Sequence, residues 1–343
     1  MKWDLDLLDG YTSQFMGKAA SRRRIGGFFS MIAPQLWSAI RGKGFDAVVI
    51  HGHNLAAHHL ALVAAKSSNT PVFARAETHL GLSRSAWRQT MRTPLLKAWY
   101  RAFDGFLAIG TRNRQYYEAM GVPASKLFSM PYAIDNDRFL RATQLTSGKR
   151  DAIRSKLGVD DDAPAIIYAA KFDRRKRPAD LIEAFHKLQQ SGLTAHLVMV
   201  GSGRLDGQLK AMVAARNTQN IVFPGFVNQA ELPEIYAACD VFVLPSENEP
   251  WGLAVNEAMC AGLPIVLSEE IGCAADLVES GVNGATFKAG DVDALTDALG
   301  AILTNPDHRA QCSEASVARI PQWSFAQCAE GLRSAIDATR SRI

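Results

Sequence analysis

The sequence alternates between short apolar runs and longer segments in which apolar residues recur at helical spacing. The runs are rich in Val, Ile, Leu and Phe, and they are too short for ordinary helices. In the first part of the chain they lie at 47–51, 71–76, 106–109 and 127–131. In the second part they lie at 165–170, 196–200, 221–223, 241–244 and 265–267. The alternation predicts β-strands separated by α-helices.

Strands that are apolar along their whole length are typical of a parallel sheet covered on both faces. The rhythm lapses at the polar segment 146–151, which we interpret as a linker or boundary loop. We therefore predict an α/β protein of two Rossmann-like, doubly wound domains that face each other across a cleft. The N-terminal domain is predicted at residues 1–148 and the C-terminal domain at 149–343, with the last helix crossing back to the N-terminal domain.

Composition narrows the class of protein. The chain has 343 residues, of which 48% are hydrophobic and 21% charged, and these values exclude a disordered or fibrous protein. Residues 1–150 carry 21 Lys and Arg against 9 Asp and Glu, a net charge of +12, whereas the remainder carries 17 against 25, a net charge of −8. The acidic start MKWDLDLLDG is unlike a signal peptide, and the five cysteines form no CxxC pair. We therefore expect a cytoplasmic protein without disulfides or a zinc site.

The segment 241–262, VFVLPSENEPWGLAVNEAMCAG, contains the clearest candidate chemistry. A strand is followed by a polar loop, and Pro250 is predicted just inside the start of a helix. Free N–H groups at that helix end would attract an anion, and two carboxylates flank it, Glu249 and Glu257. On one helix the two would lie roughly 12 Å apart along the axis. A nucleotide-sugar fits this layout, since hydroxyls lie on both sides of its diphosphate; the alternative is a pair of solvated surface carboxylates.

The same region resembles a known family. SENEPWGLAVNEAMCAGLPIVLSEEIGCAADLVESGVNG closely follows the donor-site signature of retaining GT-B glycosyltransferases of family 4. Further matches lie upstream in the expected order: AAKFDRRKRPADLIEAF, HLVMVGSG, and NIVFPGFVNQAELPEIYAACDVFVLPS. The resemblance covers about residues 103–300.

The resemblance implies roles for particular residues of this chain. Lys171 and Lys176 would clamp the donor diphosphate, although lysine in place of the usual arginine at Lys171 loses the bidentate fork, and a solvated basic patch is the alternative. Glu257 would accept hydrogen bonds from the ribose, and Glu249 would face the transferred sugar. The other implied donor-binding residues are Trp251, Gly252 and Leu253 at the helix end, Gly201 and Gly203 near the phosphates, and Phe226 and Val227 near the base.

The implied activity is that of a retaining hexosyltransferase in cell-envelope or exopolysaccharide biosynthesis. The donor would be a UDP- or GDP-sugar and the acceptor a glycan or a lipid-linked sugar. The resemblance implies that the leaving diphosphate accepts the acceptor's proton on the same face of the sugar. The Asp-x-Asp tripeptides follow no strong strand, so we expect no metal and no other cofactor.

The N-terminal part adds three expectations. His79 lies where the family places a histidine in the cleft, although a solvated or capping histidine is an equal alternative. Arg84, Arg88 and Arg92 would form one basic stripe on a helix. Few acids accompany the stripe, which favours an anionic membrane or a lipid diphosphate as partner, and a solvated helix face is the alternative. Nucleic acid is not expected, because no fold signature for it accompanies the charge. We therefore expect a protein that contacts the inner face of the membrane.

One departure from the family leaves alternatives open. Family members begin with an apolar strand and a Gly-rich loop, and no comparable strand precedes 47–51. We therefore expect an incomplete N-terminal domain. A nucleotide-sugar-binding protein without turnover and a GT-B-type sugar-nucleotide epimerase remain as alternatives to a transferase.

Overall fold

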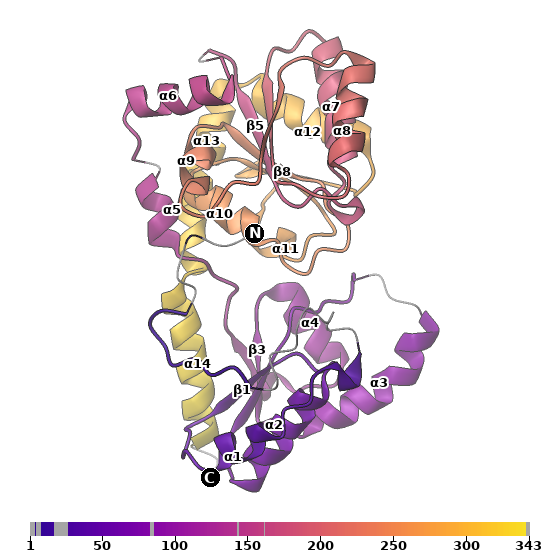
Figure 1. Ribbon diagram of the computed structural model, residues 1–343, viewed down its shortest axis with the longest axis vertical. Helices are drawn as coiled ribbons and strands as arrows, with labels where there is room; N and C mark the ends of the chain where they lie inside the picture. Colours follow the sequence, from indigo (N-terminus) through magenta and orange to yellow (C-terminus); the bar gives the residue numbers. More distant parts are fainter. Residues whose placement is uncertain are drawn as a thin grey trace. The chain divides into compact units, whose positions relative to one another are not determined.

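The computed structural model describes residue 4 and residues 8–16, 27–82, 86–142, 144–160 and 162–340. Within these residues the chain divides into two compact units (Figure 1). Unit 1 includes Asp4 and Tyr132–Phe325, and unit 2 includes residues 8–131 together with residues 326–340. Each unit is built on one parallel β-sheet.

The sheet of unit 1 has six strands in the order β10-β9-β8-β5-β6-β7. Its strands are β5 (Ala165–Ala169), β6 (His196–Val200), β7 (Ile221–Gly225), β8 (Val241–Leu244), β9 (Ile265–Ser268) and β10 (Gly284–Phe287). The central strands are buried on both faces, and β6 and β8 contain no exposed residue. This burial explains why they read as uninterrupted apolar runs.

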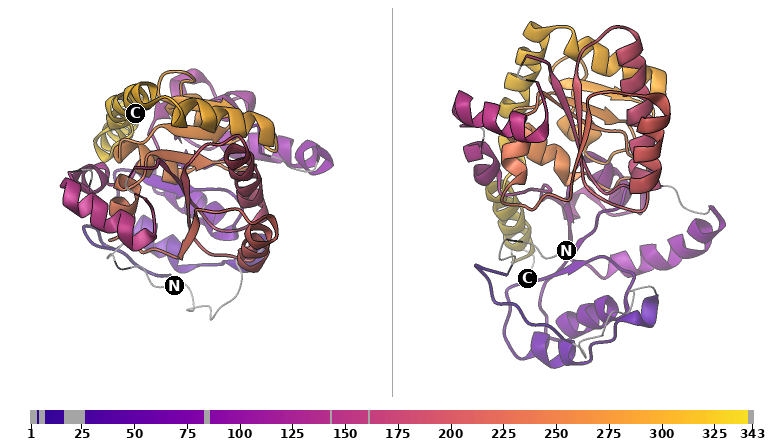
Figure 2. Two further views of the ribbon diagram at one scale, coloured as in Figure 1. Left: turned by 90° about the horizontal axis from the view of Figure 1, so that it is seen from above. Right: turned by 45° about the horizontal axis from the view of Figure 1, so that its top comes forward.

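Helices cover both faces of this sheet (Figures 1 and 2). They are α5 (Asn136–Ala142), α6 (Ser147–Leu157), α7 (Pro178–Gln190), α8 (Asp206–Arg216), α9 (Leu232–Ala237), α10 (Leu253–Cys260), α11 (Ala274–Leu277), α12 (Val292–Leu303) and α13 (Pro306–Arg319), with 3-10 turns η3 (Arg174–Lys176) and η4 (Ile320–Gln322). Helix α7 packs against α8 and α12, whereas α9 packs against α10.

The strand order places a switch point between β5 and β8. From β5 the chain proceeds outward through β6 to β7, and it then returns to β8 on the other side of β5 and proceeds to β9. Right-handed crossovers in these opposite directions put α7 and α8 on one face and α9 and α10 on the other. The helices that follow β5 and β8 therefore lie on opposite faces of the sheet. The loops that lead into these helices lie beside each other at its carboxyl edge, where open α/β sheets bind ligands.

Unit 2 has four parallel strands in the order β1-β2-β3-β4. The strands are β1 (Val48–His51), β2 (Val72–Arg75), β3 (Gly105–Ala108) and β4 (Leu127–Ser129). The helices are α1 (Gln35–Arg41), α2 (Ala56–Ser67), α3 (Ala86–Arg101), α4 (Thr111–Ala119) and α14 (Phe325–Arg340), with 3-10 turns η1 (Phe28–Ser30) and η2 (Ala124–Lys126).

The strands of unit 2 divide their side chains between two apolar clusters. On β2, Val72 and Ala74 pack with helices α2 to α4 and their aromatic residues, whereas Phe73 packs with Leu107 and Ala335 of α14. Since successive strand residues point to opposite faces, this division shows that the sheet is covered on both sides. Gly331 of α14 lies so close to β4 that an added Cβ would be 1.8 Å from the Ser129 carbonyl oxygen.

The predicted α/β class and parallel sheets are confirmed, and each predicted strand is present within about one or two residues. The predicted loop at 146–151 is wrong, because these residues begin helix α6. Its N-cap is Thr146, whose side chain accepts a hydrogen bond from Lys149 N, and it ends at Gly158 with φ +69°. Strand β10 was not predicted.

The limits of the compact units also differ from the boundary placed at 148. Helix α5 packs against α9 and α10, so the chain enters unit 1 already at Tyr132. At the other end, Ala326 and the residues after it return to unit 2. All five cysteines are free thiols. No helix in the described part of the chain is long and apolar enough to cross a membrane.

Candidate functional site

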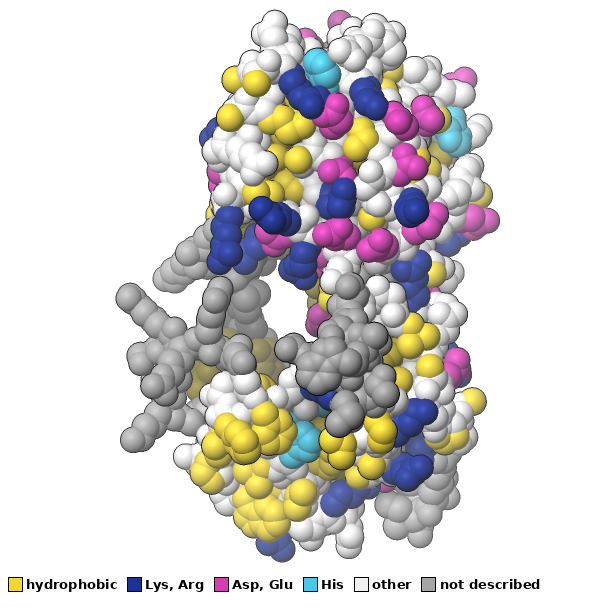
Figure 3. Space-filling view, turned by 90° about the vertical axis from the view of Figure 1, so that its right-hand side faces the viewer, with side chains coloured by type: hydrophobic (Ala, Val, Ile, Leu, Met, Phe, Trp, Pro, Cys, Tyr) yellow, Lys and Arg dark blue, Asp and Glu magenta, His cyan; other side chains and the backbone are white. Residues whose placement is uncertain are grey.

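Two loops of unit 1 meet beside the switch point, a basic loop at residues 171–177 after β5 and an acidic loop at 246–252 after β8. Lys176 Nζ of the basic loop donates to Glu249 Oε2 of the acidic loop, and the side chains are 17% and 15% exposed. Asp173 Oδ1 accepts from Lys176 N at 3.2 Å and so caps the 3-10 turn η3. The structure therefore brings together two of the predicted residues as a half-buried ion pair. Figure 3 shows the wider pattern on one face of unit 1, where basic and acidic side chains lie beside each other.

Lys171 differs from Lys176 in its surroundings. Its side chain is exposed, and among the described residues it takes part in no ion pair. Its backbone is held, because the carbonyl oxygen of Lys171 accepts from Tyr168 Oη at 3.2 Å. A solvated lysine in an ordered loop agrees with both interpretations of the basic patch, and its diphosphate contact stays a prediction.

Glu257 lies in α10 with its carboxylate oriented by α9. Tyr236 Oη donates to Glu257 Oε2 at 3.0 Å. Burial raises the pKa of Glu257 to about 7, and the Tyr236 hydrogen bond and the charge of Arg138 limit the rise. Glu257 is therefore a half-buried carboxyl group that titrates near neutrality, which a solvated surface glutamate would not do.

The predicted start of the helix is wrong. Helix α10 begins at Leu253 with Gly252 as N-cap, so Pro250 precedes the helix and Glu249 lies in the loop. Gly252 has φ +98°, a left-handed conformation that glycine adopts without strain and that ends the loop there. The axial separation of about 12 Å for two glutamates on one helix therefore does not apply. Leu253 and Gly252 do lie at the helix end, as predicted.

Trp251 is buried rather than open at the helix end. It is 3% exposed, and its indole Nε1 donates to Asn256 Oδ1 at 3.0 Å. Asn256 in turn donates through Nδ2 to the Tyr132 carbonyl oxygen at 3.0 Å. The indole thus anchors the first turn of α10 to the segment that enters unit 1, and the predicted contact between Trp251 and the donor stays a prediction.

The glycines of this region allow close approach between loops. An added Cβ at Gly201 would lie 2.0 Å from the Ala170 carbonyl oxygen, and one at Gly203 would lie 2.4 Å from the Phe172 carbonyl oxygen. These glycines let the loop after β6 pack on the loop after β5; their contact with phosphates stays a prediction. Gly272 has the same role for the acidic loop, because its Cβ would lie 1.9 Å from the Pro250 carbonyl oxygen.

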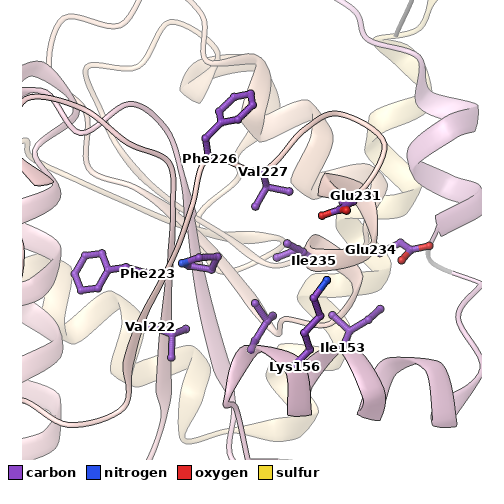
Figure 4. Close-up of a pocket in the computed structure, with 11 residues that line it drawn as sticks. Ile153, Lys156, Val222, Phe223, Phe226, Val227, Glu231, Glu234 and Ile235 are labelled. Carbon is purple, nitrogen blue, oxygen red and sulfur yellow. The ribbon is translucent and has the colours of Figure 1, made fainter. Parts of the chain in front are cut away.

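Phe226 and Val227 follow β7 and line a pocket of about 520 Å³ between α6, β7 and α9 (Figure 4). Eight of its eleven lining residues are apolar, and Lys156, Glu231 and Glu234 are the charged ones. None of the other predicted site residues lines it. Phe226 is partly exposed, at 38%, and thus open to stacking.

The remaining predicted residues belong to unit 2. His79 is 3% exposed, which excludes a solvated histidine, and its position in the cleft stays a prediction. In the basic stripe, Arg92 is exposed and donates to Asn54 Oδ1 at 3.4 Å. Arg84 and the side chain of Arg88 lie outside the described residues.

Sequence reasoning missed three residues that position the site. Tyr236 orients Glu257, and Arg177 and Glu247 form a second ion pair between the basic and acidic loops, with Arg177 Nη1 at 2.8 Å from Glu247 Oε2. Arg177 and Glu247 carried a signal, as charged residues close to the predicted loop residues, whereas Tyr236 carried none. In the described residues, no three His, Cys, Asp or Glu side chains are grouped so as to hold a metal ion, and the expectation of metal-free chemistry stays a prediction.

Comparison with known proteins shows which families the chain resembles. A family model described as glycosyl transferases group 1 matches residues 149–319, and a model described as glycosyltransferase family 4 matches residues 15–138. Among curated relatives, a GDP-mannose-dependent monoacylated alpha-(1-6)-phosphatidylinositol monomannoside mannosyltransferase of Corynebacterium glutamicum is 29% identical over 57% of this chain and 52% of its own length. A D-inositol 3-phosphate glycosyltransferase of Xylanimonas cellulosilytica is 28% identical over 62% of this chain and 51% of its own length. The chain spans about half the length of these relatives.

Solved structures support the fold. Anabaena HepE in complex with UDP has a TM-score of 0.74 at 19% identity, covering 89% of this chain and 82% of its own. Sucrose-phosphate synthase of Thermosynechococcus elongatus has a TM-score of 0.71 at 20% identity, covering 90% of this chain and 78% of its own. With its two parallel-sheet Rossmann-like units, the chain therefore has the GT-B fold, in which residues 15–138 match a glycosyltransferase family 4 domain and residues 149–319 match a glycosyl transferases group 1 domain.

Proposed function

We propose that this protein transfers a hexose from a UDP- or GDP-sugar to a glycan or lipid-linked acceptor, with retention of the anomeric configuration. The observation that carries the proposal is the arrangement at the switch point of unit 1. There the half-buried Lys176–Glu249 pair lies in the loops that precede α7 and α10, and Glu257 lies on α10 itself. A cation and the N–H groups of a helix end can bind a diphosphate, and a carboxylate can accept hydrogen bonds from ribose hydroxyls.

The chemistry follows from these roles. The bond between the anomeric carbon and the diphosphate oxygen breaks, and the acceptor hydroxyl oxygen bonds to that carbon from the same face. The acceptor proton passes to the departing diphosphate. Lys176, the N–H groups at the start of α10 and Lys171 stabilise the charge that develops on the diphosphate, while Glu249 holds the sugar.

The relatives support both donor classes. The Corynebacterium enzyme is named as GDP-mannose-dependent, and HepE was solved with UDP and with UDP-glucose. An amylovoran biosynthesis glycosyltransferase of Erwinia amylovora, 31% identical over 53% of this chain, favours a role in polysaccharide or glycolipid assembly.

The basic charge of the first half and the exposed apolar residues of unit 2 favour a lipid-linked acceptor at an anionic membrane. These residues include Phe28, Phe29 and Ile32, and hydrophobic side chains gather on the face of unit 2 seen in Figure 3. Aromatic and aliphatic side chains beside cations are typical of surfaces that bind the bilayer interface. Flotation with anionic and neutral vesicles tests this part, and equal recovery with both would contradict it.

The test of the main proposal is calorimetric titration of the full chain with UDP, GDP and ADP, followed by their hexose conjugates. We expect saturable binding of UDP or GDP, and release of that nucleotide when a glycan or polyprenyl-linked sugar is added. Binding without release under any acceptor would favour the non-transferring alternative. Conversion of the sugar-nucleotide to its epimer would favour an epimerase.

A further inference from the structure

Two ion pairs join the basic loop to the acidic loop, and only one of them contains proposed donor-binding residues. The first joins Lys176 to Glu249, both of them residues to which the proposed function gives a donor contact. The second joins Arg177 Nη1 to Glu247 Oε2 at 2.8 Å, and neither residue has a role in that proposal. A backbone hydrogen bond of 2.8 Å, from Glu247 N to the Arg175 carbonyl oxygen, runs between the same loops.

The first pair is affected when a donor binds. A diphosphate brings negative charge to Lys176, and the same ammonium group already neutralises Glu249. Sharing one cation between two anions weakens the bond to each of them. The contact that joins the loops through Lys176 therefore loosens at the step at which the site needs a fixed geometry.

The second ion pair, Arg177–Glu247, is supported by further contacts of Arg177. Arg177 Nε also donates to Asp180 Oδ2 at 2.7 Å, so one guanidinium is held by two carboxylates from two elements. The guanidinium lies against the turn after β10, where an added Cβ at Gly290 would be 2.9 Å from Arg177 Nη2. The three side chains are only partly exposed, Arg177 at 27%.

The backbone of Arg177 indicates that its side chain matters. Arg177 has φ +49°, a left-handed conformation that costs an L-residue backbone strain and that glycine adopts freely. The turn between η3 and α7 would form more readily with glycine, so the conformation is maintained against the preference of the residue. The side-chain bonds of Arg177 contribute to this, together with backbone hydrogen bonds from Arg177 N to the Arg174 carbonyl oxygen at 3.1 Å and from Asp180 N to the Arg177 carbonyl oxygen at 3.2 Å.

We propose that the Arg177–Glu247 ion pair is a positioning clamp that keeps the basic and acidic loops together while Lys176 exchanges Glu249 for the donor diphosphate. The inference rests on the proposed function. Arg177 and Glu247 act through Lys176 and Glu249 and touch no donor atom themselves.

The test measures the affinity of the full chain for UDP and GDP by calorimetry and its stability by thermal unfolding. The variants are Glu247→Ala, Glu247→Gln, Arg177→Gly and the double variant Arg177→Gly/Glu247→Ala. The control is Lys187→Ala, which removes an exposed ion pair to Asp293 at the far end of the same helix α7. Arg177→Gly removes the ion pair and at the same time relieves the backbone strain at this position. We therefore expect this variant to unfold at the same temperature as the wild type.

We expect Glu247→Ala and Arg177→Gly each to weaken nucleotide affinity by about tenfold. The double variant should bind nucleotide no more weakly than either single variant, because each single substitution already removes the same Arg177–Glu247 ion pair. Glu247→Gln, whose amide oxygen still accepts from Arg177, should recover part of the affinity, and Lys187→Ala should match the wild type. Wild-type affinity in both single variants, additive losses, or a loss that only follows the unfolding temperature overturns the clamp.

Lys176→Ala, measured beside them, separates the two proposals. If Lys176→Ala abolishes nucleotide binding while the Arg177 and Glu247 variants bind nucleotide normally, the result supports the donor site and contradicts the clamp. If the wild type binds neither nucleotide, the proposed function fails, and the clamp fails with it.

Discussion

Tyr236 Oη lies 3.0 Å from Glu257 Oε2, so a tyrosine of α9 orients the carboxylate of α10. Burial and this hydrogen bond act on the pKa of Glu257 in opposite directions, and burial prevails, which leaves the pKa at about 7. The group is therefore poised between its two protonation states at neutral pH.

Donor binding should depend on pH through Glu257. The carboxylate accepts hydrogen bonds from ribose hydroxyls better than the neutral acid does, so donor affinity should rise as pH passes upward through about 7 and level off above it. UDP-glucose or GDP-mannose is the appropriate titrant, because their phosphates do not ionise in this range. Calorimetry at a series of pH values checks this, and Glu257→Gln should give a flat profile. An equal slope in that variant would assign the pH dependence to another group.

Tyr236→Phe should shift the same profile toward higher pH. Without the phenol donor the ionised form of Glu257 loses a charge-assisted hydrogen bond, so the pKa of the carboxyl rises. At pH 7 we expect donor affinity to fall by about three- to tenfold and to recover at more alkaline pH. A loss that is the same at every pH would mean that Tyr236 only supports the packing.

Glu249→Gln and Lys176→Ala should have opposite effects on nucleotide binding. Removing Glu249's charge frees Lys176 for the diphosphate, so affinity for UDP or GDP should rise by about three- to tenfold while sugar transfer falls. Lys176→Ala removes the cation, and affinity should drop by about tenfold or more. Titration with the nucleotide alone measures both. If both variants bind nucleotide more weakly, the ion pair is needed intact and the exchange of partners is excluded.

Gly272→Ala should destabilise unit 1. Its Cβ would lie 1.9 Å from the Pro250 carbonyl oxygen, so the acidic loop or the loop before α11 must move. Overpacking of this kind costs about 1–3 kcal/mol in the free energy of unfolding. Gly207→Ala is the matched control, because Gly207 lies in helix α8 with nothing within 4 Å of its Cβ, and there alanine should stabilise by up to about 1 kcal/mol. Denaturant unfolding should therefore give a lower free energy of unfolding than wild type for Gly272→Ala and a higher one for Gly207→Ala.

Arg154 and Arg150 both bind Asp240, and they differ in burial. The guanidinium of Arg154 is enclosed and donates to Asp240 Oδ2 at 3.2 Å and to the Ala238 carbonyl oxygen at 3.0 Å. Arg150 binds the other oxygen of Asp240 at 2.9 Å, with its side chain 32% exposed. Arg154→Met should cost about 3–5 kcal/mol in the free energy of unfolding, whereas Arg150→Met should cost about 1 kcal/mol or less. Equal costs would show that burial does not determine the strength of these contacts.

The sequence by itself determined the class of fold and the described strands other than β10. Parallel strands buried on both faces must be apolar throughout, so their positions are visible in the pattern of residues. It also identified Glu249, Glu257 and Lys176 as candidate site residues, because their types and spacing follow a known signature. It did not determine where α10 begins, since that depends on Gly252 adopting φ +98° where the acidic loop packs on the loop at Gly272.

Only the tertiary structure decided which residues meet. The order of the strands sends the chain in two directions from β5, and this brings the loop that contains Arg177 against the loop that contains Glu247, and Tyr236 against Glu257. Contacts of this kind join residues far apart in the chain, and no local pattern encodes them. The pKa of Glu257 was decided in the same way, because burial is a property of the surrounding fold and not of the residue or its sequence neighbours.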